Sequence, residues 1–235
     1  MEIALILAAL LIGGALNFVI KPRGAFIKKL AKVYVVLVCV ISCSAWLFYF
    51  AGFKNANINL LLGDIADWGK YAGRLLLGYL SINILLALRD TPDNYPLKKI
   101  TRLTLLAVSV LTGSTFLIAV VGKATNFAEM VTFFTQSGYA IWFLYFIMAA
   151  EFLGAFGILL HFKLKTGPLA TTGLALIMIG ALYTHRHNND PFSDSYAALS
   201  QFITLGIILM IYYFERQAVL QTEGDPHSVM LEQTT

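Results

Sequence analysis

The sequence predicts an all-α membrane protein with seven transmembrane helices. Three observations indicate this fold class. Of the 235 residues, 58% are hydrophobic and 13% are charged, whereas a soluble domain carries about 45–50% apolar and about 25% charged residues. Seven apolar segments are long enough to cross a bilayer, which takes about 20 helical residues. The basic residues are also unevenly divided between alternate connections, as the topology of a membrane protein requires.

Prolines separate the apolar segments. Pro22, Pro92 and Pro191 lie in connections, and Pro168 stands where the first turn of a helix tolerates proline. We expect transmembrane helices at 2–20, 33–52, 71–89, 103–122, 139–160, 168–184 and 196–214. Segment 57–68 is too short to span, but its apolar residues recur at helical spacing, so we expect an amphipathic helix along the membrane surface.

The first segment is predicted to be a retained span. The chain begins Met1-Glu2 without positive charge, and its first cations, Lys21 and Arg23, follow the apolar run. A signal peptide has the opposite order. The chain is thus divided into residues 1–100 with three spans, residues 101–215 with four spans, and a polar tail at 216–235.

Lys and Arg fall mostly on one side of the predicted membrane. Connections 21–32 and 89–102, with the residues after the fifth and seventh spans, hold twelve of them, and the other connections hold five. Positive charge marks the cytoplasmic side. We therefore expect an outer N-terminus and a cytoplasmic tail, in a bacterial cytoplasmic membrane. Because the cations cluster beside apolar segments, the net charge of +4 does not indicate nucleic acid as a partner.

A single acidic residue interrupts the predicted fifth span. Residues 143–160 read FLYFIMAAEFLGAFGILL, in which Glu151 alone is charged. Counted at about 1.5 Å per residue from Tyr139, Glu151 lies about 18 Å from the outer end of the span. Gly154 and Ala155 share its helical face one turn further on, and small residues let helices approach closely in lipid. We expect Glu151 to face the interior of the protein.

The same count places polar residues of three other spans at the depth of Glu151. Together with Glu151 they form a predicted intramembrane polar layer: Asn83, Thr112, Ser42 and Cys43. Lys123 is predicted to lie at the outer end of the fourth span, too far along the axis to reach Glu151. Burial without a cation favours the neutral acid, so we expect a protonated carboxyl group bonded to this layer. Two roles stay open, a structural hydrogen bond and a proton or ligand site.

A second candidate site is a shallow pocket at the outer end of the last four spans. Its predicted members are Lys123, Trp142, His185 and Gln201. His185 belongs to a His-x-His pattern, but spacing fixes no third ligand, so no metal site is predicted. The chain also has no nucleotide-binding loop, no HExxH pattern and no aligned pair of catalytic carboxylates. We therefore predict no catalytic residues and no standalone enzyme.

The last four spans carry a set of glycine, aromatic and polar residues at characteristic positions. The set comprises Gly113, Phe116, Gly122-Lys123, Phe127, Phe134, Gly138-Tyr139, Tyr145, the run EFLGA at 151–155, Met178, Ala181 and Thr184-His185. With these residues, the part from 101 to about 215 resembles the DoxX-like membrane family. The resemblance implies that the last four spans form a four-helix bundle.

The resemblance also implies a link to membrane redox systems, such as quinone-coupled sulfur oxidation. We therefore expect an accessory subunit of a larger redox- or quinone-linked membrane complex, with membrane lipids and other membrane protein subunits as its partners. The residues themselves predict no cofactor, and a quinone or a lipid is the ligand expected near Glu151. Two alternatives stay open: a membrane assembly factor or cargo chaperone, and a small carrier of protons or solutes.

Overall fold

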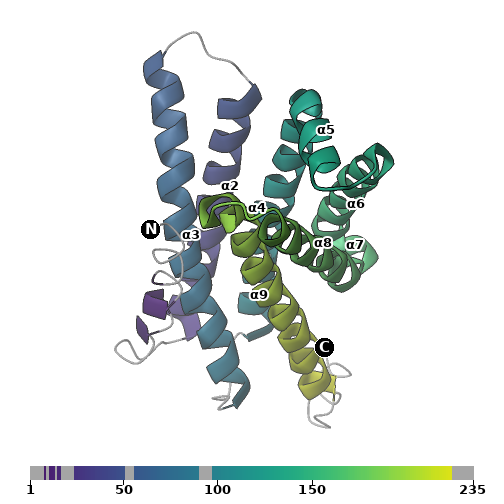
Figure 1. Cartoon of the computed structure of the whole chain (residues 1–235). Coiled ribbons are helices and arrows are strands. Elements are labelled where there is room, and N and C mark those ends of the chain that lie inside the picture. The colour runs from purple at the N-terminus through teal and green to yellow at the C-terminus, as the bar shows by residue number, and fades with distance from the viewer. Residues whose placement is uncertain are drawn as a thin grey trace.

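The structure is a computed structural model that describes residues 8, 11–13, 15, 16, 24–50, 56–89 and 97–223. These residues are helical apart from short turns, and no strand occurs among them, which confirms the predicted all-α fold class. The helices are α2 (Gly24–Phe50), α3 (Ala56–Arg89), α4 (Leu97–Thr125), α5 (Phe127–Gln136), α6 (Ile141–Leu159), α7 (His161–Leu164), α8 (Gly167–His187) and α9 (Phe192–Glu223) (Figure 1).

Five helices in these ranges are long and apolar enough to cross a membrane. They are α2 over Gly24–Phe48, α4, α6, α8, and α9 over Phe192–Arg216. These five correspond to the second, fourth, fifth, sixth and seventh predicted spans. The predicted first span, 2–20, falls largely outside the described residues. The predicted tail, 216–235, begins inside α9, which continues to Glu223, and its remaining residues lie outside the described part.

Helix α3 joins two segments that the sequence predicted to be separate. It is one helix of 34 residues, and Figure 1 shows it unbroken. The prediction of a separate surface helix at 57–68 is therefore corrected. The physical reason is that no proline interrupts α3, and Gly69 lies so close to Ile41 of α2 that a Cβ atom there would collide with the Ile41 side chain. Within α3 only Tyr71–Ala87, shorter than the five spans, is strongly apolar.

Helix α4 is central to the packing. It contacts α2, α6 and α9, and α8 contacts both α6 and α9. Buried apolar side chains form two cores. The first contains residues of α2, α3, α4 and α9, among them Tyr34, Leu80, Ile100 and Ile208. The second joins α4, α6, α8 and α9 through Phe116, Ala155, Ile158, Leu174, Met178, Ala198 and Leu205.

Glycine residues bring α6 close to α8. A Cβ atom on Gly154 would lie 2.6 Å from Cγ of Leu174, and one on Gly157 would lie 2.6 Å from Cβ of Ala170. Such distances are too short for real side chains, so these two positions require glycine at the present helix separation. As predicted, the small residues one turn beyond Glu151 therefore point into the protein.

Candidate functional site

Glu151 on α6 forms an ion pair with Lys123 on α4. The Nζ atom of Lys123 donates a hydrogen bond to Oε2 of Glu151 over 2.7 Å. The Glu151 side chain is 4% exposed and the Lys123 side chain 22% exposed. The carboxylate is thus enclosed by protein, and the ammonium group reaches it from a more open position. A charge-assisted hydrogen bond of this kind is stronger than one between neutral groups.

The register of the two antiparallel helices explains this contact. Gly113 on α4 packs against Leu159 on α6. From that contact, Lys123 lies ten residues along α4 and Glu151 lies eight residues back along α6, which correspond to rises of about 15 and 12 Å. Both residues therefore arrive at nearly the same level, and the long lysine side chain covers the difference.

The prediction that Lys123 lies too far from Glu151 was wrong. It placed the end of the fourth span at residue 122 and the start of the fifth at 139, whereas α4 continues to Thr125 and α6 begins at Ile141. The expected neutral acid depended on there being no cation within reach. In the structure the hydrogen-bond partner of Glu151 is Lys123, rather than the predicted polar layer.

The other members of the predicted polar layer differ in their hydrogen bonding and burial. Nδ2 of Asn83 donates to the backbone oxygen of Tyr79, one turn earlier on the same helix, over 2.8 Å. The hydroxyl groups of Ser42 and Thr112 are buried without a hydrogen-bond partner in the described part of the chain. Cys43 is exposed. Among the described residues, no hydrogen bond joins these side chains to Glu151.

Aromatic rings pack at the same end of the protein as the ion pair. The rings of Phe127 and Tyr145 lie 5.3 Å apart, and the ring of Tyr139 lies 6.0 Å from Phe134 and 5.1 Å from Phe143. This packing fixes α5, which has no buried residue of its own, to the start of α6. The Tyr139 hydroxyl group also forms a hydrogen bond with the hydroxyl group of Thr184 on α8, over 2.9 Å.

Replacing Tyr139 with phenylalanine is expected to lower the free energy of unfolding by about 1 kcal/mol, because one partly buried hydrogen bond is lost. The measurement is thermal unfolding in detergent. Tyr145→Phe is the matched control, because the Tyr145 hydroxyl forms no hydrogen bond within the described residues. Equal losses in both variants would show that the contact between Tyr139 and Thr184 contributes nothing.

The four residues of the predicted outer pocket have different surroundings. Lys123 is held in the ion pair, Trp142 is 67% exposed and packs edge to face on Phe143, and Gln201 is half-buried on α9. Of the four, only His185 lines the hollow of about 300 Å³ between the end of α8 and the start of α9. This hollow is lined by Leu182, His185, Arg186, Asp190, Phe192 and Ser195.

Within that hollow His185 already has a partner. Its Nδ1 atom lies 2.8 Å from Oδ2 of Asp190, and its ring lies 5.7 Å from that of Phe133. Among the residues that the structure describes, no group of three His, Cys, Asp or Glu side chains is arranged to hold a metal ion. The arrangement is that of a loop fastened to the end of a helix.

The sequence did not predict two polar contacts that join helices far apart in the chain. His161 places Nε2 3.5 Å from Oε2 of Glu215, and its Nδ1 accepts a hydrogen bond from the backbone N–H of Gly167 over 3.2 Å. Arg74 on α3 donates a hydrogen bond to the hydroxyl of Ser200 on α9. Spacing gives no signal for either contact, because the partners are more than fifty residues apart.

An apolar layer separates the Lys123–Glu151 pair from His161. Ala155 and Ile158 lie between Glu151 and His161 along α6, and both are fully buried. Leu174 of α8 packs with them in the same core, together with Phe116 and Leu205. The two polar ends of these helices are therefore insulated from each other by close-packed hydrocarbon.

Comparison with known proteins confirms the predicted resemblance. Residues 107–210 match the DoxX-like family, and this range contains both members of the ion pair. The five apolar helices and this match identify an integral membrane protein with a DoxX-like domain at 107–210. No curated protein and no solved structure matches the chain.

Proposed function

We propose that this protein is an integral accessory subunit of a larger, redox- or quinone-linked membrane complex. In this proposal α4, α6, α8 and α9 form the four-helix bundle of the DoxX-like domain. The observation that carries the proposal is the Lys123–Glu151 pair. Its two charged groups satisfy each other across a helix contact, next to a packed apolar core, so the pair serves to hold α4 against α6.

The same geometry makes a carrier of protons or solutes the weaker alternative. Transport through the domain would require a polar path past Glu151. The side chains between Glu151 and the other end of α6 are apolar and fully buried at Ala155 and Ile158. A rigid structural domain is easier to reconcile with this packing than a moving one.

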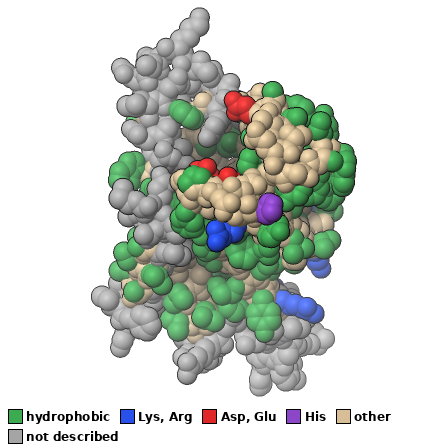
Figure 2. Space-filling model, viewed as in Figure 1, with side chains coloured by type: hydrophobic (Ala, Val, Ile, Leu, Met, Phe, Trp, Pro, Cys, Tyr) green, Lys and Arg blue, Asp and Glu red, His purple; other side chains and the backbone are tan. Residues whose placement is uncertain are grey.

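The outward face of α6 offers a surface for lipid or a partner subunit. Its large exposed side chains include Trp142, Tyr145, Phe146, Phe152, Leu153 and Phe156. Figure 2 shows hydrophobic side chains covering much of the visible face, with few charged ones among them. Flat apolar faces of this kind suit a subunit that packs beside other membrane helices. The redox and quinone link is what the resemblance to the DoxX-like family implies, and residues 107–210 match that family.

Isolation of the protein from its own membranes tests this proposal. Extracted in mild detergent with an affinity tag, the chain is expected to migrate well above its monomer mass of 25.9 kDa, with a stoichiometric partner that carries a redox cofactor. Quinone extracted from the preparation and measured by chromatography is expected in constant ratio to the complex. The orientation of the protein in the membrane is tested in intact cells. A C-terminal tag on the cytoplasmic side should be protected from a protease added outside.

A bare monomer without quinone would contradict the proposal. Partners that appear only in substoichiometric amounts, and only during their own synthesis in a pulse-chase experiment, would instead favour an assembly factor or cargo chaperone. Gly173→Ala is the control variant for this isolation experiment and is expected to behave like the unaltered protein. A Cβ atom placed at Gly173 has no neighbouring atom within 4 Å.

A further inference from the structure

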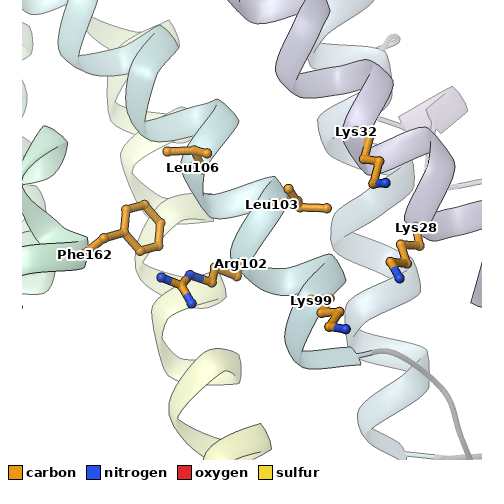
Figure 3. A pocket seen from close by; sticks show the side chains of 7 residues that line it. All are labelled: Lys28, Lys32, Lys99, Arg102, Leu103, Leu106 and Phe162. Carbon is orange, nitrogen blue, oxygen red and sulfur yellow. The ribbon is translucent and has the colours of Figure 1, made fainter.

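A basic hollow lies at the end of α4 opposite to Lys123. It has a volume of about 520 Å³. Four cationic side chains line it: Lys28 and Lys32 from α2, and Lys99 and Arg102 from α4. Figure 3 shows these side chains gathered around the first turns of α4, next to α2. All four belong to connections that the charge distribution predicts to be cytoplasmic.

The remaining wall of this hollow is apolar. It consists of Leu103 and Leu106 on α4 and of Phe162 on α7. The guanidinium carbon of Arg102 lies 5.6 Å from the centre of the Phe162 ring, within the range of a cation–π contact. The hollow thus combines a cationic part with a hydrocarbon part, and Leu106 is exposed where α4 continues into the predicted membrane.

Within the described ranges, no acidic side chain pairs with the cations of this hollow. Helices α2 and α4 both begin here, and neither has an acidic residue in its first turn. A helix N-terminus carries partial positive charge, so cations there are unfavourable. Lys28 and Lys32 are also four residues apart on one helix, a spacing at which like charges repel.

We propose that this hollow binds the phosphate-bearing headgroup of an acidic phospholipid. The four cations attract the phosphate. The acyl chains of the lipid lie along Leu103, Leu106 and Phe162. A free phosphate ion would use only the cationic part of the hollow, whereas a lipid uses both parts. This site is separate from the Lys123–Glu151 pair and does not depend on the accessory-subunit proposal.

Lipid binding to the full-length protein tests this inference. Delipidated protein in an uncharged detergent is titrated with dioleoylphosphatidylglycerol or with dioleoylphosphatidylcholine, and bound lipid is counted by native mass spectrometry. The acidic lipid is expected to bind at least about tenfold more tightly, because uncharged detergent leaves the local cations as the source of selectivity. Lys28→Gln with Lys99→Gln is expected to weaken this binding about 30-fold, and Arg102→Gln alone about fivefold.

The matched control is Lys29→Gln with Lys98→Gln. These two exposed lysines neighbour Lys28 and Lys99 on the same helices but do not line the hollow. The control removes the same charge and is expected to change binding less than about threefold. Circular dichroism and the unfolding temperature confirm that each variant is folded, and the single Arg102→Gln variant gives a second result if the double variant is not.

Three results would overturn the inference. The first is equal binding of the two lipids to the unaltered protein. The second is an equal loss in the Lys28/Lys99 variant and in the Lys29/Lys98 control, which would make the attraction a general property of the basic surface. The third is binding of glycerol phosphate as tight as that of the acidic lipid, which would make the ligand a soluble anion.

Discussion

Replacing Lys123 with methionine is expected to lower the free energy of unfolding by about 3–5 kcal/mol, the cost of leaving a buried charge without its partner. The Glu151 side chain is 4% exposed, so water cannot replace the ammonium group. Glu151→Gln is expected to cost less, because Lys123 is 22% exposed and its long side chain can turn its charge towards solvent. The measurement is thermal or denaturant unfolding of each variant in the same detergent.

Lys123→Arg is the control for this prediction. Arginine keeps the positive charge and can donate to a carboxylate, so most of the stability is expected to remain. The interpretation of the pair as a helix clamp would be wrong if Lys123→Met were as stable as the unaltered protein. It would also be wrong if Glu151→Gln were the more damaging of the two changes.

Gly157→Ala is expected to destabilise the protein by about 1–3 kcal/mol, the usual cost of overpacking a close contact. The new Cβ atom would lie 2.6 Å from Cβ of Ala170 on α8. Alanine has no rotamer that could move this atom away, so α6 and α8 must separate. Separation would also lengthen the hydrogen bond from the Thr166 hydroxyl to the backbone oxygen of Gly157, which measures 2.7 Å. Unfolding temperature measures the effect.

The matched control for Gly157→Ala is Gly173→Ala on α8. The space around Gly173 is open to 4 Å, so the same added methyl group meets nothing. Because alanine favours a helix over glycine by about 1 kcal/mol, Gly173→Ala is expected to be neutral or slightly stabilising. Similar losses in the two variants would mean that the contact between α6 and α8 is not close.

Sequence composition placed five of the seven predicted spans on helices that are long and apolar enough to cross a membrane. The predicted spans 103–122 and 139–160 fall on α4 and α6 with small shifts at their ends, because the apolar length of a segment is a local property. The same reasoning failed at 57–68. Polar residues there lower the hydropathy of the segment, but they do not interrupt the hydrogen bonding of a helix, so α3 continues through it.

The candidate site could be predicted only in part. The sequence singled out Glu151 correctly as a buried residue on the protein-facing side of its helix. It did not identify Lys123 as the partner, because the register between α4 and α6 depends on the tertiary contact of Gly113 with Leu159. Errors of two or three residues at the ends of the two spans were enough to hide the ion pair.

The basic hollow illustrates the same division. The sequence alone indicates only the membrane orientation from the four cations Lys28, Lys32, Lys99 and Arg102. That α2 and α4 begin side by side, and bring these side chains to a common apolar wall, follows from the packing of the two helices. Charge counts identify the side of the membrane, whereas the shape of a binding site requires the fold.

A double-mutant cycle on Lys123 and Glu151 tests the central claim most directly. The free energies of unfolding of the unaltered protein, Lys123→Met, Glu151→Gln and the double variant give the interaction energy of the two side chains. The 2.7 Å contact predicts a favourable interaction of about 2 kcal/mol, so that the double variant is more stable than the sum of the single losses allows. Losses that add to within about 0.5 kcal/mol would contradict it, because they would show that the two side chains do not interact.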